Sequence, residues 1–533
     1  MGKAIGIDFG TTNTVVSYLS KNGHLRQYKQ NGQPIIPTAI YFLSGGPNGG
    51  QYVIGSQAKS RIDAMRQPKA GITDFKSHLG EPTFVYEVEA ENKDVFKVKP
   101  KEAMKLFLHA VITEVENTLR KTFGGEGRID RAVITVPAKF NDVEKSLIRR
   151  AAVAAMNLHI SKVKLVMEPT AAAVAAQEDE GDGKGNDDTV LIYDFGGGTF
   201  DVSLIKKEHG KFRQVAANGE PKLGGNNLTE IMMETLLAQI NDEYGTEFPM
   251  DPGEFDEDLH EISQLDYQKN MLALRRAANQ AKEELSEELE TDVSINVILP
   301  NEKNETFYRT VSRDDYEKLI REKIKHTADI TWRTIHEPQA EAIAPIDRIV
   351  MAGGSSRIPM IKALLEEKLG RGDIVYSEDV STLISRGACL LANSIQDIDN
   401  LTQQVTSVQL GVIASEGTSF NQFRMIVPEN EPLPCDRSED FHLNSDEQRR
   451  LDIAYYERDV KNYPKAKRID DNGIQEVDIL HIDIPEGRNK DNTIVTVTFG
   501  VKADGCVAFT AQLKDEQGNV LQEVSVQQES DLE

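Results

Sequence analysis

The sequence predicts an α/β protein made of two similar lobes and a smaller β-sandwich. Two observations predict the lobes: the stretches Ala4–Leu19 and Thr189–Ile205 share one layout, and they lie a whole domain's length apart. A third observation predicts the sandwich, because the last part of the chain alternates apolar and polar residues in short segments between turn residues.

The stretch Thr189–Ile205 reads TVLIYDFGGGTFDVSLI and predicts two strands around a glycine turn. Three glycines let the turn reach positive φ and bring its N–H groups close to another group. Successive N–H donors make an anion site, with phosphate as the natural ligand, although an ordinary glycine hairpin has the same pattern. Asp194 and Asp201 flank the turn and would repel a bare phosphate, so we expect a divalent cation such as Mg²⁺ between them.

The stretch Ala4–Leu19, AIGIDFGTTNTVVSYL, repeats this layout with Asp8 and Gly10 and with hydroxyls at Thr11 and Thr12. The simplest account is a duplicated fold in which each half offers one hairpin to a shared cleft. Two opposed hairpins of this kind would clamp one polyphosphate.

Composition limits the classes of function. A chain of 533 residues is long enough for several domains, and a formal charge of −25 argues against a nucleic-acid or membrane-surface partner. The apolar runs have the length of strands, and the first strand begins at once, so we expect neither a transmembrane helix nor a signal peptide. The three cysteines lie far apart and fit neither a disulfide framework nor a zinc site, so a reducing cytoplasm is the expected compartment.

In the first lobe, a strand is predicted at 35–42, and Lys76 stands just before a glycine break. Lys76 is either a solvated surface charge or a cation that reaches the transferred phosphate. Glu168 ends a strand before a helix, so it either orients an attacking water or pairs with the helix dipole. The other predicted elements are a helix at 101–121, a strand at 132–136, a helix from 142 to 156, a strand at 165–167 and a helix at 171–176.

A polar loop at 178–188 separates the two lobes. The second lobe continues with helices predicted at 228–244, 266–288 and 313–336 and a hairpin at 293–297 and 306–311. The segment Ile349–Pro359 is a third glycine element, which leads from a strand into a helix. Its glycine pair would let a flat base or ribose approach the backbone, and Arg357 can stack on an adenine ring. Helices at 360–369 and 383–394 complete this lobe.

Six motifs occur in one order: DFGTTNT, VPAKFND, EPTAAA, DFGGGTFD, LGGN and AGGSSRIP. In this order and spacing the chain resembles the seventy-kilodalton heat-shock chaperones of the DnaK type, which belong to the actin and sugar-kinase superfamily. The resemblance implies an actin-like, ribonuclease H-like ATPase domain at 1–395, with lobe I at about 1–185 and lobe II at about 186–380. It also implies a linker at 396–405 and a substrate-binding β-sandwich at 406–533.

The resemblance assigns a role to each matching residue. The catalytic group would be Lys76, Glu168, Thr199 and Asp201, and Asp8, Asp194 and Asp201 would hold Mg²⁺ through waters, with K⁺ as a further ion. Pro137 matches a proline thought to relay the nucleotide state. ATP or ADP would be bound by Gly10, Thr11, Thr12, Asn13, Gly196, Gly197, Gly198, Thr199, Gly224, Gly225, Lys282, Ser286, Gly353, Gly354, Ser355 and Arg357.

Four departures from the family pattern stand in this sequence. Aspartates that usually follow the LGG turn are replaced by Asn227 and Thr229, and Glu283 stands where an adenine-stacking arginine can occur. The linker is polar where the family has leucines, so we expect weaker docking in an apolar groove. The chain stops at Glu533, without room for the helical lid of the family, so we expect fast exchange of extended peptides.

The sandwich strands are predicted at 408–414, 420–427, 441–443, 451–457, 476–484, 493–501 and 506–513. The resemblance implies a slow ATPase and chaperone that binds extended apolar segments of unfolded proteins, with J-domain co-chaperones and nucleotide-exchange factors as partners. The alternative is a nucleotide-switch adaptor whose sandwich binds one dedicated protein. A small-molecule kinase on the same fold is disfavoured, because no motif for a base beside a sugar pocket occurs near Asp194.

Overall fold

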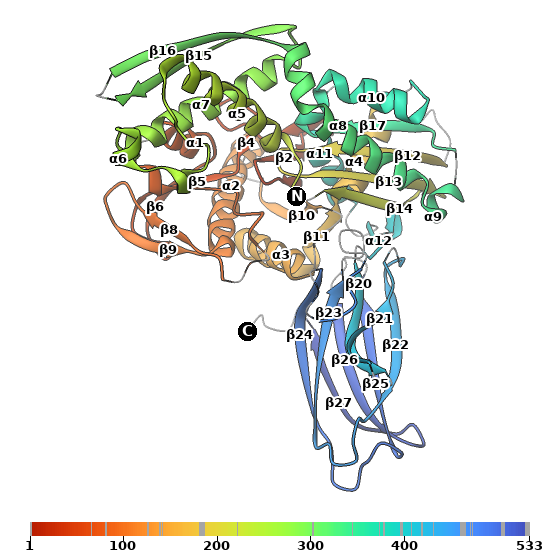
Figure 1. Ribbon diagram of the computed structural model, residues 1–533. Helices are drawn as coiled ribbons and strands as arrows, with labels where there is room; N and C mark the ends of the chain where they lie inside the picture. Colours follow the sequence, from red (N-terminus) through yellow and green to blue (C-terminus); the bar gives the residue numbers. More distant parts are fainter. Residues whose placement is uncertain are drawn as a thin grey trace.

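The computed structural model describes residues 3–64, 67–79, 81, 83–124, 127–137, 140, 142–180, 187–220, 222–300, 303–343, 345–372, 374–376, 379–394, 398–403, 405–406, 408–416, 419–429, 431–458, 465–469, 471, 473–502 and 507–527. A large α/β body carries the N-terminal part of the chain, and an elongated β-sandwich extends from one end of it (Figure 1). Separate apolar cores fill the two lobes of the body and the sandwich.

The sheet of lobe I has the order β11-β10-β1-β2-β3, and β4 also pairs with β2. The central strand β1 pairs in parallel with β10 and antiparallel with β2, so the β1–β2 connection is a tight hairpin. The strands are β1 (Lys3–Phe9), β2 (Asn13–Leu19), β3 (Leu25–Gln27), β4 (Ile36–Pro37), β10 (Ile129–Val136) and β11 (Val163–Met167).

The sheet of lobe II repeats this order as β18-β17-β12-β13-β14, with β19 added at its edge. Its central strand β12 pairs in parallel with β17 and antiparallel with β13, as β1 does with β10 and β2. The duplication predicted from the two hairpins is therefore confirmed. The strands are β12 (Asp188–Phe195), β13 (Phe200–Glu208), β14 (Lys211–Glu220), β17 (Arg348–Ala352), β18 (Ile374–Tyr376) and β19 (Thr402–Gln403).

Two helices join the lobes, because each of them packs on the sheet of the other lobe. α4 (Glu168–Glu180) packs on β12, β13 and β14, whereas α11 (Leu383–Asn393) packs on β1, β2 and β10, and the two helices pack on each other. A Cβ placed on Gly387 of α11 would lie 1.8 Å from the carbonyl oxygen of Ala171 in α4. Only glycine allows this close crossing, which fixes the lobes at the base of the cleft.

The remaining elements pack around the two sheets or extend the lobes beyond them (Figure 1). In lobe I they are β5 (Ala39–Ser44), β6 (Gln51–Ile54), β7 (Gly71–Thr73), β8 (Tyr86–Glu89), β9 (Val95–Val98), α1 (Gly55–Asp63), α2 (Pro100–Phe123) and α3 (Asp142–Met156). In lobe II they are α5 (Gly225–Tyr244), α6 (Glu257–His260), α7 (Gln264–Glu284), β15 (Glu290–Leu299), β16 (Lys303–Ser312), α8 (Arg313–Ile335), α9 (Pro338–Glu341) and α10 (Pro359–Leu369). No helix within the described ranges is both long enough and apolar enough to cross a membrane.

The helix predicted at 266–288 ends at Glu284, so Ser286 lies past its end. Leu285 is buried and turns the chain toward β15, which begins at Glu290. The sequence pattern did not reveal this stop, since the residues after Glu284 continue a helix-forming composition.

The sandwich consists of the sheets β21-β20-β23-β24 and β22-β25-β26-β27. The strands are β20 (Gln409–Glu416), β21 (Ser419–Val427), β22 (Cys435–His442), β23 (Arg450–Arg458), β24 (Ile474–Asp483), β25 (Thr493–Val501), β26 (Val507–Asp515) and β27 (Val520–Gln527). The sequence prediction missed β27 and began β22 too late. Both strands lie at sheet edges and carry many polar residues, so their alternation is weak.

The segment expected as a polar linker contains α12 (Ile398–Leu401) and β19. β19 pairs in parallel with β14, with Thr402 opposite Phe212 and Gln403 opposite Arg213. Ile398 and Thr402 are buried, so this segment is seated on lobe II by backbone pairing as well as by apolar contact. Gln404 lies outside the described residues.

Candidate functional site

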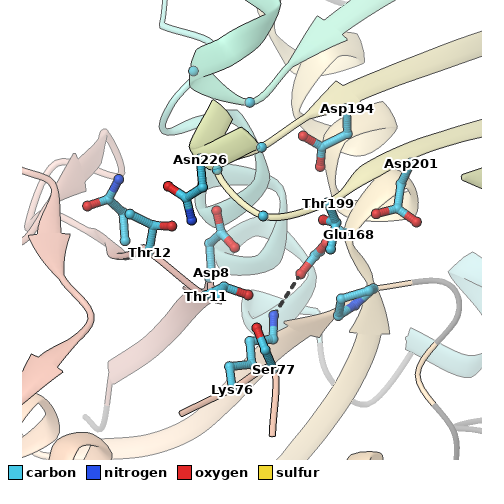
Figure 2. Close-up of a pocket in the computed structure, with 18 of the residues that line it drawn as sticks. Asp8, Thr11, Thr12, Lys76, Ser77, Glu168, Asp194, Thr199, Asp201 and Asn226 are labelled. Carbon is cyan, nitrogen blue, oxygen red and sulfur yellow. Dashed lines mark hydrogen bonds and ion pairs between the residues drawn. The ribbon is translucent and has the colours of Figure 1, made fainter. Parts of the chain in front are cut away.

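The two glycine hairpins meet in the lining of one pocket of about 580 Å³. The turns are closed alike, since Gly10 N donates to Asn13 O and Gly196 N donates to Thr199 O, each over 3.0 Å. They also touch: a Cβ on Gly197 would lie 2.5 Å from the Thr12 hydroxyl oxygen. Figure 2 shows Thr11 and Thr12 facing the turn that ends at Thr199.

Helix α5 fixes the orientation of the second hairpin. Gly225 N donates to Gly196 O over 3.0 Å, and Asn226 N donates to Gly197 O over 2.7 Å. The Ser355 hydroxyl also donates to Gly196 O, over 2.9 Å. Because N–H and C=O point in opposite directions in a trans peptide plane, the amides that follow these carbonyls point away from α5. They are left to serve a ligand in the pocket.

Four carboxylates converge on the same pocket. Asp8 lies near the end of β1, Asp194 and Asp201 stand directly opposite each other on β12 and β13, and Glu168 begins α4. Burial and then repulsion by Glu168 raise the pKa of Asp8 to about 7. The pKa of Asp194 is raised for the same reasons, first by burial and then by Glu168 and the two neighbouring aspartates. The pocket thus holds more buried negative charge than it neutralises.

Lys76 is the buried cation beside these acids. Its side chain is almost fully enclosed, at 2% exposure, which excludes the solvated surface charge considered above. Nζ donates to Phe9 O over 2.5 Å and to Glu168 Oε1 over 3.3 Å (Figure 2). Lys76 therefore connects the loop after β7 to the end of β1 and to the start of α4.

Glu168 stands at the start of a helix, as the sequence predicts, and it also faces the pocket. It is the first residue of α4, where a carboxylate is favoured by the helix dipole, and it also lines the pocket and pairs with Lys76. The pair leaves its second carboxylate oxygen available to a water or to a ligand in the pocket.

The acid cluster fits a hydrated divalent cation. Its surplus negative charge, expressed in the raised pKa values of Asp8 and Asp194, would be relieved by a cation. Among the described residues, no three histidine, cysteine or acidic side chains are close enough to hold a metal ion directly. An ion held here would therefore keep waters in its coordination shell, as Mg²⁺ does.

The residues expected around the adenosine divide into two groups. Gly353 and Gly354 line the pocket, whereas Lys282, Ser286, Ser355 and Arg357 do not. Gly224 and Gly225, which were also expected to bind the nucleotide, are likewise outside the pocket lining. Arg357 is half exposed and pairs with Asp379, 3.7 Å away. A rotation of this side chain would be needed to cover a base.

Lys282 is held inside lobe II. Its Nζ donates to Gly225 O, Thr229 Oγ1 and Asn279 Oδ1, at 3.1, 3.0 and 2.8 Å. Burial lowers its pKa to about 8. Thr229, one of the departures from the family pattern, thus serves as an acceptor for Lys282. Asn227, another departure, accepts a hydrogen bond from Gly224 N over 2.9 Å and so stabilises the start of α5.

Sequence reasoning missed part of the lining. The pocket also contains Asp74, Ser77, His78 and Glu81 from the loop that carries Lys76, and Lys222, Asn226 and Glu230 from the region of α5. Their proximity to Lys76 and to the LGG turn was the available signal, but no periodicity shows which of them face a cleft. Figure 2 shows Asn226 near Thr12 and Asp8, with Ser77 beside Lys76.

Comparisons with known proteins agree with this geometry. The sequence model of the family described as Hsp70 protein matches residues 4–533. The chain is 28% identical over 524 residues to the chaperone protein DnaK of Mycoplasma mycoides subsp. mycoides SC, covering 96% of this chain and 78% of that protein. It is 27% identical over 461 residues to the chaperone protein DnaK of Thermotoga petrophila, covering 85% of this chain and 70% of that protein.

Proposed function

The chain belongs to the Hsp70 family, and from this premise we propose which of its residues hydrolyse ATP and how the nucleotide is held. It is an ATP-dependent molecular chaperone and an ATPase, it binds nucleotide, and it acts on unfolded polypeptides together with co-chaperones. Its fold is an actin-like ATPase domain and a β-sandwich, which we propose to span 1–395 and 406–533 with a linker at 396–405.

One observation carries the site assignment: both glycine hairpins, the acid cluster and Lys76 line a single pocket. From lobe I the phosphates are held by the amides and hydroxyls of Thr11 and Thr12, in the turn that Gly10 and Asn13 close. Gly196, Gly197, Gly198 and Thr199 hold them from lobe II, with Gly353 and Gly354 beside the nucleoside. Gly224, Gly225, Lys282, Ser286 and Ser355 support the lobe II wall, and Arg357 covers the base after leaving Asp379.

The chemistry rests on positioning and electrostatics. Lys76 Nζ, fixed by Phe9 O and Glu168, places a positive charge against the developing charge of the transferred phosphoryl group. The free carboxylate oxygen of Glu168 and the Thr199 hydroxyl orient the attacking water. Asp8, Asp194 and Asp201 hold Mg²⁺ through its waters, and the ion when bound neutralises charge on the phosphates. K⁺ is proposed as a further ion of this pocket.

The β-sandwich binds extended apolar segments of unfolded proteins through backbone hydrogen bonds and side-chain pockets. The seating of β19 on β14 supports a structural link between the sandwich and the lobe that carries the second hairpin. J-domain co-chaperones and nucleotide-exchange factors are the proposed partners, and the cytoplasm is the proposed compartment.

Single-turnover ATP hydrolysis tests the proposal, with and without a panel of extended apolar peptides. We expect the parent chain to bind Mg·ATP by calorimetry and the peptides to accelerate hydrolysis. Lys76→Ala should still bind the nucleotide but hydrolyse it about 10²- to 10³-fold more slowly. The matched control is Lys206→Ala, which removes a lysine paired with Glu208 outside the pocket. Equal rates for Lys76→Ala and the parent would refute the catalytic assignment, and absence of nucleotide uptake would refute the site.

A further inference from the structure

The turn that carries Lys76 is held by bonds that the mechanism above does not use. After β7 ends at Thr73, Asp74 adopts a left-handed conformation with φ of 60°, which is uncommon for a residue with a side chain. The Ser77 hydroxyl donates to Asp74 Oδ1 over 2.6 Å, and Ser77 N donates to Asp74 O over 3.2 Å. These bonds stabilise a tight turn from which Lys76 reaches inward to Phe9 O.

Three aromatic side chains then close this loop on itself, and we call His78, Phe84 and Tyr86 the aromatic clamp. The His78 ring stacks on Phe84 with centroids 3.9 Å apart and planes 4° apart. The Tyr86 ring meets Phe84 edge-on, with centroids 4.9 Å apart. The Tyr86 hydroxyl donates to Thr73 O over 3.2 Å. The Tyr86 hydroxyl therefore links the end of this loop to Thr73, the residue at which the loop begins, with Lys76 between them.

Charged neighbours reinforce the aromatic clamp. Glu81 Oε2 lies 3.1 Å from His78 Nδ1 and so holds the imidazole in the plane that stacks on Phe84. Burial, followed by repulsion from Asp74 and Glu81, raises the pKa of Tyr86, so its hydroxyl remains a donor to Thr73 O. His78 and Glu81 line the nucleotide pocket, whereas Phe84 and Tyr86 stand outside the lining that the structure describes.

We propose that the aromatic clamp positions Lys76 for ATP hydrolysis, with Phe84 and Tyr86 as positioning residues. The inference rests on the proposed role of Lys76. A lysine side chain has several rotatable bonds, so the place of Nζ depends on its acceptors at one end and on its backbone at the other. Phe9 O and Glu168 fix the first end, and the aromatic clamp fixes the second. A displacement of about 1 Å in such a group lowers a rate by about 10²-fold.

Phe84→Ala tests this proposal, because Phe84 contacts both other members of the aromatic clamp and does not line the pocket. We expect single-turnover hydrolysis about tenfold slower than in the parent, with a dissociation constant for Mg·ATP within about twofold of the parent value, because the hairpins that bind the phosphates are untouched. Phe84→Tyr keeps the stacked ring and should restore the rate. A Phe84→Ala protein as fast as the parent would overturn the proposal.

Two further variants separate positioning from general destabilisation. Phe255→Ala removes a ring that stacks on His260 and Tyr267 in lobe II, outside the pocket lining, and it should lower the melting temperature without slowing hydrolysis. Tyr86→Phe removes only the bond to Thr73 O and should slow hydrolysis about threefold even if Phe84→Ala does not fold. Loss of rate in Phe255→Ala equal to that in Phe84→Ala, or an unchanged rate in Tyr86→Phe, counts against the proposal.

The double variant Lys76→Ala/Phe84→Ala tells the proposed function and this inference apart. If the aromatic clamp acts through Lys76, the double variant hydrolyses ATP at the rate of Lys76→Ala alone. A further tenfold loss means that the aromatic clamp acts on another group and overturns the inference. A normal rate in Lys76→Ala refutes the catalytic role of Lys76 itself, whereas a slow Lys76→Ala with a normal Phe84→Ala refutes the aromatic clamp only.

Discussion

Replacement of Asp8 by asparagine is expected to stabilise the nucleotide-free protein at neutral pH. Asp8 lines the pocket beside Glu168, Asp194 and Asp201, and desolvation followed by repulsion from Glu168 raises its pKa from 3.8 to about 7. The folded state therefore binds the Asp8 proton more tightly than the unfolded state does. The stability that Asp8 contributes is complete below pH 4, falls as the pH rises from about 4 to about 7, and stays low above pH 7.

The size of the stabilisation by Asp8→Asn follows from the rise in the pKa of Asp8. A rise in the pKa of Asp8 from 3.8 to about 7 corresponds to at most about 4 kcal/mol of stability. Asparagine has the shape of the protonated acid and does not ionise, so Asp8→Asn avoids the loss. Its advantage over the parent in free energy of unfolding should be near zero below pH 4 and reach up to about 4 kcal/mol at pH 8.

The assay is urea unfolding in EDTA at several pH values between 5 and 8, followed by far-ultraviolet circular dichroism. This signal reports the sheet of lobe I that carries Asp8 as well as the sandwich that carries Asp515. The control is Asp515→Asn, since a hydrogen bond from the Asn519 side chain, together with backbone bonds, lowers the pKa of Asp515 and predicts the opposite sign. A variant Asp8→Asn that is equal to or weaker than the parent at pH 8 would refute the account of the acid cluster.

Three further predictions concern the frame around the pocket. Gly387→Ala should destabilise the ATPase domain by about 1–3 kcal/mol in thermal unfolding, because its Cβ would lie 1.8 Å from Ala171 O, and Gly372→Ala, with only ordinary contacts, should not. Asp63→Ala should speed ADP release up to about fivefold in stopped-flow measurements, since Asp63 of α1 pairs with Arg276 of α7 across the two lobes at 3.8 Å and an exposed pair contributes at most about 1 kcal/mol. The double variant Thr402→Pro/Gln403→Pro should remove the acceleration of hydrolysis by peptides while basal hydrolysis stays, because β19 then has no N–H to donate to β14; unchanged acceleration would contradict this.

The sequence predicted those parts of the fold and the site that depend on local patterns. Both glycine hairpins, with Asp8 and Asp194 at their strands, follow from apolar runs interrupted by turn residues, and their duplication followed from one comparison within the chain. The edge strand β27 was missed because its polar residues face solvent and its place is fixed by pairing with β26.

The nucleoside side of the pocket was harder to predict, because it depends on contacts between distant segments. The sequence predicts that Lys282 binds the nucleotide. In the structure its three hydrogen-bond acceptors belong to α5 and α7, which only the fold brings together. The sequence predicts that Arg357 stacks on the base, but in the structure its guanidinium pairs with Asp379. The sequence did not predict His78 as part of the site, because His78 and its stacking partner Phe84 both lie outside helices and strands and so show no periodic pattern.

The pairing of β19 with β14 affects which residue types the linker can contain. Thr402 and Gln403 pair with the backbone of β14, and backbone pairing does not depend on which side chains the paired residues carry. A polar connection can thus be anchored as well as a leucine-rich one. β14 in turn pairs with β13, which starts directly after the Gly196 turn, so three neighbouring strands connect the start of the sandwich to the proposed phosphate site.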